Sequence, residues 1–390
     1  MKLKLERLFY WAIIFQILAT QGVLFFNIFK YFGNWEIKKI THPLSFLFVL
    51  SVFVIKAVKK MTVTILDVLF FGYLTIFFII MLFNVDGIES GYVVFREVNF
   101  IFVLIFIFSQ IEISKRNWNK ILNVLFILLI LNSIFILLTN YLGPEKYMKM
   151  ITGRYKWGVD PEYKFKISNF YRFWRSPALI GNAASVAYFS VISYLLMDQN
   201  EKFKRKKYLA LFPLTFSFVR SAYLIFLVYE FLKFFTKKKN LKILVLIFKI
   251  GTPILIILGI VLSKYDILST ASLLERFYLW GNKTSVEYNL FFGGAIGTIG
   301  GGARGEGFLA TIDSYWLYLL FSVGFIGIIF MLLFVYEKSK KTNKFYFILI
   351  SFSLAGFLVS FNQSLVFLAL FPLFFLKIKD IDVLNLDNEP

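Results

Sequence analysis

The segment SYWLYLLFSVGFIGIIFMLLFVY, residues 314–336, is long enough and apolar enough to cross a membrane as a single helix. It contains no charged side chain, and about 20 predominantly apolar residues cover the hydrocarbon core of a bilayer. The rest of the chain is similar in character, because 59% of its residues are hydrophobic and its mean hydropathy is +0.73. This composition predicts an all-α polytopic membrane protein and argues against a soluble globular core.

Comparable apolar segments recur along the chain and predict about twelve transmembrane helices. The first follows the basic sequence MKLKLER. It is too long for the core of a signal peptide and has no small-residue cleavage site behind it, so we expect it to remain as an anchor. In chain order the predicted spans are residues 8–28, 43–58, 62–83, 93–111, 121–142, 177–197, 207–218, 221–236, 242–262, 314–336, 345–361 and 363–376.

Lysine and arginine orient these spans. If the N-terminus is cytoplasmic, alternate crossing places every lysine-rich connector on the inner side, as the positive-inside rule requires. These connectors are residues 56–60, 114–120, 201–207, 237–242 and 337–344. We therefore expect both termini, including the tail at 377–390, to be cytoplasmic. The net charge of +20 then reflects topology and gives no indication of nucleic-acid binding.

The same alternation leaves two longer extracytoplasmic segments, residues 143–176 and 263–313, in a chain that otherwise forms one integral membrane domain, residues 1–390. The first segment is rich in lysine and arginine, against the usual charge asymmetry of outer connectors. Its positive charge fits either an anionic ligand, such as a lipid-linked pyrophosphate, or contact with lipid headgroups.

The second outer segment contains a dense run of glycines. Gly300, Gly302 and Gly305 match the spacing G-x-G-x-x-G, but the run lies between membrane spans and lacks the strand and helix of a dinucleotide-binding unit. Two interpretations remain. The glycines form a flexible loop, or they allow a close backbone approach that presents N–H groups to an anion or a sugar.

Ionisable residues near the membrane divide into two groups. Arg220 lies at the outer turn between two short spans, where a guanidinium needs either a ligand or a buried acid as its partner. Asp67, Glu230 and Lys233 lie near the inner span ends, where snorkelling toward water is expected to suffice. The chain has no cysteine and one histidine, so no metal site or cofactor is predicted.

Four stretches in the C-terminal two thirds of the chain carry a family resemblance. They are SPALIGNAASVAYF (176–189), FSFVRSAYLIFLVYEFL (216–232), ERFYLWGNKTSVEYNLFFGGAIG (275–297) and DSYWLYLLFSVGFIGIIF (313–330). Their order resembles the O-antigen polymerase and O-antigen ligase superfamily of bacterial membrane glycosyltransferases. That resemblance implies a bundle similar to the GT-C glycosyltransferases, with its active site at the outer face of the cytoplasmic (inner) membrane.

The resemblance also implies roles for individual residues. The polymerase joins undecaprenyl-pyrophosphate-linked oligosaccharides, so arginines are expected to bind the departing pyrophosphate and a carboxylate to accept the proton of the attacking hydroxyl. The expected pyrophosphate ligands are Arg220, Arg276 and Arg304, with Arg172 and Arg175 as secondary ones. Asp313 or Glu306 is the expected base. Sugar rings are expected to stack on Trp174, Tyr171, Trp280 and Tyr315.

Two departures from the family pattern bear on the function. Val219 replaces the usual serine before the helix-turn arginine, so a polar partner is missing at that position. No histidine lies near Asp313, and this absence favours a polymerase over a ligase. There are two alternatives. The first is a ligase that moves the glycan to another acceptor, and the second is a flippase or transporter, which should show two similar halves and polar residues near the middle of the membrane. The expected partners are the lipid-linked oligosaccharide, membrane lipid, and the chain-length regulator and flippase of the same pathway.

Overall fold

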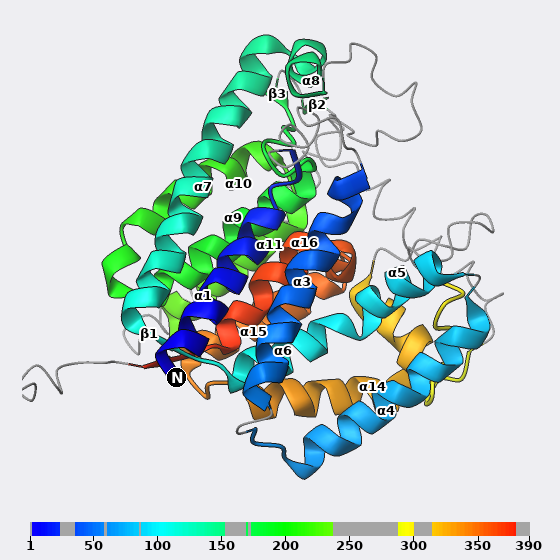
Figure 1. Ribbon diagram of the computed structural model, residues 1–390. Helices are drawn as coiled ribbons and strands as arrows, with labels where there is room; N and C mark the ends of the chain where they lie inside the picture. Colours follow the sequence, from blue (N-terminus) through cyan, green and yellow to red (C-terminus); the bar gives the residue numbers. More distant parts are fainter. Residues whose placement is uncertain are drawn as a thin grey trace, which may run out of the picture.

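The computed structural model describes residues 2–23, 36–57, 61–85, 87–152, 169–170, 173–236, 288–299 and 314–379, and this part of the chain is mostly helical (Figure 1). The α-helices are α1 (Lys2–Ala19), α3 (Glu36–Ala57), α4 (Ile65–Asn84), α5 (Ile88–Val98), α6 (Phe100–Gln110), α7 (Lys115–Leu142), α8 (Pro144–Thr152), α9 (Ala183–Asp198), α10 (Leu211–Ser217), α11 (Arg220–Phe235), α14 (Tyr315–Lys338), α15 (Asn343–Gly356) and α16 (Leu365–Leu370). Short 3-10 helices are η1 (Glu201–Phe203), η2 (Lys206–Ala210), η6 (Phe361–Gln363) and η7 (Phe371–Phe375). The strands are β1 (Glu112–Ser114), β2 (Asn169–Phe170), β3 (Phe173–Trp174) and β4 (Lys377–Lys379).

Three helices of the described residues, α4, α7 and α14, are long and apolar enough to cross a membrane, and α5 with α6 adds a fourth if that bent pair is one span. Shorter apolar helices cover Thr41–Ala57, Ala183–Asp198 and Leu365–Phe375. The helical class is confirmed, and these apolar helices indicate a membrane protein. The predicted number of about twelve spans is not confirmed, and the span predicted at 242–262 lies outside the described residues.

Several helices begin where a short polar side chain caps the first turn. Thr64 accepts a hydrogen bond from the backbone N–H of Asp67, whose carboxylate in turn accepts one from the backbone N–H of Thr64. Ser114, Ser314 and Thr342 cap α7, α14 and α15 in the same position. Each cap binds a backbone N–H that has no partner within the helix, which sets the first residue of the span.

The span predicted at 93–111 is broken in the structure. Helices α5 and α6 meet at Asn99 with a bend of 53°. Helix α6 is almost fully buried, whereas α5 carries Arg96 and Glu97 among apolar residues. The bend therefore separates an apolar inner half from an outer half with ionisable side chains.

Helix α14 is also interrupted, at Gly324, which has φ 70° and ψ −179°. The carbonyls of Phe321 and Ser322 would bond to N–H groups one turn later in a regular helix, but here they accept from Ala295 and Gly294. The released N–H groups of Phe325 and Ile326 donate to carbonyls of the same segment, 288–299. The backbone of the outer segment thus replaces the missing helix bonds, as a broken membrane helix requires.

The glycines of this segment allow that close approach. A Cβ atom on Gly293 would lie 2.6 Å from the backbone of Gly324, and one on Gly324 would overlap the carbonyl oxygen of Phe291. Residues 288–299 therefore make a close backbone approach, but their partner is α14 and not the anion or sugar considered in the sequence analysis. Gly300, Gly302 and Gly305 lie outside the described residues.

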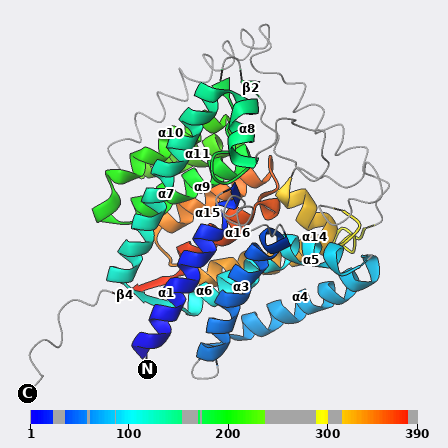
Figure 2. The ribbon, with the colours of Figure 1, turned by 45° about the horizontal axis from the view of Figure 1, so that its top comes forward.

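Several described segments that were predicted to be cytoplasmic contact one another. Strand β4 pairs in parallel with β1, which lies beside α1 (Figure 2). Glu6 accepts a hydrogen bond of 2.6 Å from the hydroxyl of Ser114, and Asn200 donates to Asn119 across 2.8 Å. The predicted tail, 377–390, therefore begins as a strand between connectors of the same group.

The described part of the first segment predicted to be extracytoplasmic, residues 143–176, lies at the opposite end of the fold from these contacts. The described part of the second, residues 288–299, lies instead beside α14 and the end of α4 (Figure 1). Helix α8 and the pair β2–β3 lie at the far end of α7 from β1 (Figure 1). There Trp174 donates its backbone N–H to Asn140, and Tyr147 donates its hydroxyl to the carbonyl of Ala178 across 2.9 Å. The segment predicted as a loop at 143–176 thus contains a helix and a short hairpin, and the side of the membrane on which each connector lies stays a prediction.

Candidate functional site

Two arginines lie close together at the end where α8, β2 and β3 lie. Arg175 follows β3 and donates its Nε–H to the carbonyl of Ser217 across 3.1 Å. Arg220 begins α11, directly after a turn in which Phe218 adopts a left-handed conformation with φ 51°. Half-burial, and then the nearby charge of Arg220, lower the pKa of the Arg175 guanidinium below its ordinary value. The two like charges therefore create a region that favours an anion.

The surroundings of this arginine pair leave room for such an anion. Arg220 is exposed, and Val219 at the N-cap of α11 contributes no side-chain hydrogen bond to the first turn. Among the residues that the structure describes, neither guanidinium forms an ion pair with a carboxylate. Two guanidinium groups beside a helix N-terminus are typical of phosphate recognition.

A polar cavity of about 540 Å³ lies next to this pair. Its walls come from α5, from the start of α9 and from the segment that joins α15 to α16. The lining residues are Val93, Arg96, Glu97, Asn182, Ala184, Ser185, Tyr188, Val359, Ser360, Gln363 and Ser364. Glu97 is only 1% exposed, and it lies close to the hydroxyl of Tyr318 on α14. The cavity thus combines a buried carboxylate, a guanidinium and several neutral hydrogen-bonding groups, which suits a hydroxyl-rich ligand.

Tyr188 connects the cavity to the arginine pair. Its ring lines the cavity, and its hydroxyl lies 3.0 Å from the hydroxyl of Ser221, the residue after Arg220. An anion bound by the arginines would therefore sit beside the mouth of a polar chamber. We define the arginine pair and this cavity together as the outer site.

The structure describes four of the residues predicted for the site. Arg175 and Arg220 are brought together as expected. Trp174 precedes Arg175 and is held through its backbone by Asn140, whereas Tyr315 at the start of α14 lines a different, apolar cavity. The remaining predicted residues, Tyr171, Arg172, Arg276, Trp280, Arg304, Glu306 and Asp313, lie outside the described residues.

Arg96 and Glu97 are members of the outer site that the sequence analysis did not identify. Their signal was present, since GYVVFREVNF, residues 91–100, places two adjacent ionisable residues inside an apolar span. Such residues inside a span are costly unless they serve a function or a specific pairing. The pair was hidden because the span was expected to be continuous, whereas the bend at Asn99 turns these side chains toward the cavity.

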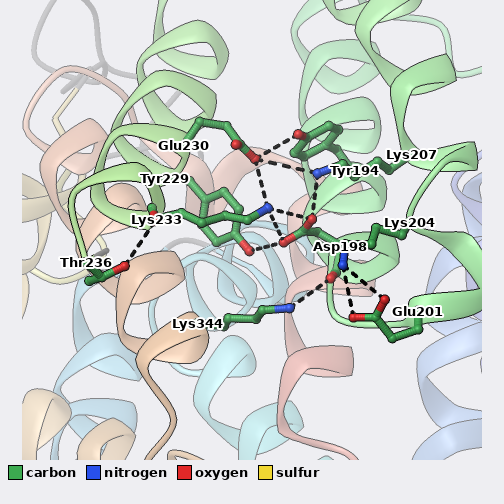
Figure 3. Close-up of polar contacts among 10 residues, drawn as sticks. All are labelled: Tyr194, Asp198, Glu201, Lys204, Lys207, Tyr229, Glu230, Lys233, Thr236 and Lys344. Atoms are coloured by element: carbon green, nitrogen blue, oxygen red, sulfur yellow. Dashed lines mark hydrogen bonds and ion pairs between the residues drawn. The ribbon is translucent and has the colours of Figure 1, made fainter. Parts of the chain in front are cut away.

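A second charged cluster lies at the opposite end of α9 and α11 (Figure 3). Asp198 accepts hydrogen bonds from Lys207 at 2.6 Å, from Lys233 at 2.7 Å and from the hydroxyl of Tyr229 at 2.7 Å. Glu230 lies 3.5 Å from the ammonium group of Lys233 and accepts from Tyr194. We call Asp198, Lys207, Tyr229, Glu230 and Lys233 the inner charge cluster.

The charged side chains of the inner charge cluster pair with one another. Its two acids and two lysines balance in charge, and both carboxylate oxygens of Asp198 are bonded. Lys344 of α15 adds a hydrogen bond of 3.2 Å to the backbone carbonyl of Asp198. Each charged member thus has a partner of opposite charge within 4 Å, as expected of a network that holds α9, η2, α11 and α15 together.

Snorkelling to water does not by itself describe the ionisable residues at these span ends, Asp67, Glu230 and Lys233, because each of the three has a partner in the protein. Lys233 turns toward Asp198, which is 1% exposed. Asp67, also 1% exposed, pairs with Lys338 at 2.7 Å. The position of an ionisable residue near a span end indicates only that its side chain can reach water. It does not indicate the oppositely charged partner, which here comes from another helix.

Among the described residues, no three histidine or acidic side chains are arranged to bind a metal ion. Comparisons with known protein families, with curated proteins and with solved structures returned no match to this chain. The outer site is therefore interpreted from its own chemistry.

Proposed function

We propose that this protein is a bacterial membrane glycosyltransferase that polymerises oligosaccharide repeat units linked to undecaprenyl pyrophosphate, at the outer face of the cytoplasmic membrane. The observation that carries the proposal is the arginine pair beside a polar cavity with a buried carboxylate. Guanidinium groups suit a pyrophosphate, and a hydrogen-bonding chamber suits a sugar.

In the proposed reaction, the terminal hydroxyl oxygen of one repeat unit attacks the anomeric carbon of a growing chain. The bond from that carbon to the pyrophosphate oxygen breaks, and its electron pair leaves with the pyrophosphate. Arg175 and Arg220 would stabilise this developing charge. The hydroxyl proton would pass to a carboxylate, for which Glu97 joins Asp313 and Glu306 as a candidate.

The finer assignments belong to the same proposal. About twelve crossings in a bundle similar to the GT-C glycosyltransferases, with both termini cytoplasmic, would place the arginine pair outside and the inner charge cluster inside. A chain-length regulator and a flippase of the same pathway would be its functional partners. The pairing of β4 with β1 and the hydrogen bond from Asn200 to Asn119, which join segments predicted to be cytoplasmic, support this orientation.

Replacement of Arg220 tests the proposal. In a strain that carries Arg220→Ala, we expect the protein to remain in the membrane and long surface glycan to be lost, with partial recovery in Arg220→Lys because an ammonium group cannot form the bidentate contact. Arg205→Ala, at an exposed inner connector, is the matched control and should leave the glycan unchanged.

The species that accumulates in the Arg220→Ala strain separates the alternatives. A polymerase defect leaves single repeat units at the outer face. A flippase defect leaves single units facing the cytoplasm, and a ligase defect leaves long polymer on the lipid carrier. Normal glycan in the Arg220→Ala strain would remove the arginine pair from the proposed function.

A further inference from the structure

A separate apolar cavity of about 410 Å³ lies between α14 and α15. These helices follow each other in the chain, yet α15 packs mainly on α11 while α14 packs on α4 and α6. The space between them is lined by Trp316, Leu319, Met331, Leu349, Phe352 and other apolar side chains. Protein interiors contain few voids larger than a water molecule, so a cavity of this size between two helices is a candidate site for an apolar group.

One side chain separates the apolar cavity from the outer site. Phe361 lies in η6, between residues that line the polar cavity, and its own ring lines the apolar one. Its ring centroid is 5.7 Å from that of Tyr188 and 6.2 Å from that of Tyr315. Tyr188 belongs to the polar cavity and Tyr315 to the apolar one. The two cavities therefore meet at Phe361.

We infer that the apolar cavity between α14 and α15 binds the isoprenoid chain of the lipid whose anionic head occupies the outer site, with Phe361 at the junction of head and chain. The choice of an isoprenoid rests on the proposed function. The continuity of a cationic, polar chamber with an apolar cavity indicates, by itself, an amphiphile with an anionic head.

The volume limits how much of the chain is held. If each carbon group takes roughly the 30 Å³ that a water molecule occupies in the liquid, the cavity holds about 14 carbon atoms, or about three isoprene units. The cavity would therefore recognise the units next to the pyrophosphate and leave the rest of the chain in the bilayer. An apolar chain gains little hydrophobic free energy on moving from lipid into protein, so its position is a better readout than its affinity.

Photo-crosslinking in nanodiscs tests this position. The probe is a polyprenyl pyrophosphate with a diazirine on its third isoprene unit, bound to the full-length protein and mapped by mass spectrometry. We expect labelled peptides from α14 and α15, and at least a tenfold loss of label when unlabelled undecaprenyl pyrophosphate competes. Labelling confined to helices outside this cavity, or equal competition by phosphatidylglycerol, would overturn the inference in favour of ordinary membrane lipid.

A pair of neighbouring variants provides the control. Leu349→Trp fills the cavity, whereas Ile350→Trp adds the same side chain at the next residue of α15, which is 44% exposed and does not line the cavity. We expect label on α14 to fall at least fivefold only in Leu349→Trp. Equal labelling of the two variants would refute the inference. If Leu349→Trp fails to fold, the positions of the labelled peptides in the unmodified protein test the inference by themselves.

The experiment also separates this inference from the proposed function. Labelling of the cavity in a protein that shows no glycan polymerisation upholds a lipid site and rejects the polymerase. Polymerisation together with labelling elsewhere supports the polymerase and rejects this lipid site.

Discussion

The inner charge cluster predicts a large loss of stability when Asp198 is neutralised. Asp198 is 1% exposed and lies 2.6 Å from the ammonium group of Lys207, which is itself 3% exposed, and 2.7 Å from that of Lys233. At an effective dielectric constant of about 20, each contact corresponds to roughly 6 kcal/mol of attraction, much of which offsets the desolvation of the ions. Asp198→Asn removes the attraction and leaves Lys207 buried, and Lys233 partly buried, without that carboxylate.

We expect Asp198→Asn to lower the free energy of unfolding by about 3–5 kcal/mol, the usual cost of breaking a buried ion pair. This corresponds to a change in the unfolding equilibrium of roughly a hundredfold or more. The measurement is reversible unfolding in mixed micelles of mild detergent and dodecyl sulfate at neutral pH, followed by circular dichroism.

A nearby surface pair provides the control. Lys204 and Glu201 form an ion pair at 3.1 Å, but their side chains are 56% and 79% exposed, so Glu201→Gln should cost less than about 1 kcal/mol. A second change, Lys207→Met on the Asp198→Asn background, should recover part of the loss because it removes one of the unpaired charges. An Asp198→Asn protein as stable as the Glu201→Gln protein would refute the view that this cluster holds the helices together.

Three further predictions concern α14, the loop that follows it, and topology. Gly324→Ala should destabilise the protein by more than about 2 kcal/mol, because φ is positive there and a Cβ atom would overlap the backbone of residues 291–293. Gly72→Ala in α4, where nothing lies within 4 Å, is the control and should be neutral or stabilising when both variants are unfolded by heat. Burial lowers the pKa of Lys340 from 10.5 to about 8, so between these pH values the unfolded state binds more protons and the free energy of unfolding should rise with pH, by about 1–3 kcal/mol. When unfolding is measured as a function of pH, Lys340→Met should lack that rise. The same pH dependence in the variant and the unmodified protein would contradict the burial of Lys340. Reporter fusions at Asn200 should be cytoplasmic and fusions at Gly301 external, and the same signal at both would contradict the predicted topology.

The positions of the helices were largely predictable from the sequence. The segment 121–142 lies within α7, and 314–336 corresponds to α14 within two residues at its C-terminal end. These predictions depend only on local composition, because a backbone in an apolar environment must satisfy its hydrogen bonds within the helix.

The candidate site was predictable only in part. Arg220 was identified because a guanidinium between two short spans is costly without a partner. Arg96 and Glu97 were not, because their orientation depends on the bend at Asn99. Asp313 and Glu306 remain predictions, since they lie outside the described residues.

The sequence by itself therefore determined which segments form apolar helices, since this follows from the solvation of residues close together in the chain. The tertiary structure alone decided that residues 288–299 replace the hydrogen bonds broken at Gly324, that Asp198 binds Lys207 and Lys233, and that α5 and α9 enclose a polar cavity. Each of these features depends on a partner from a distant segment of the chain. The hydropathy of a residue measures its preference for an apolar environment over water, but it does not identify the group that the residue contacts once buried.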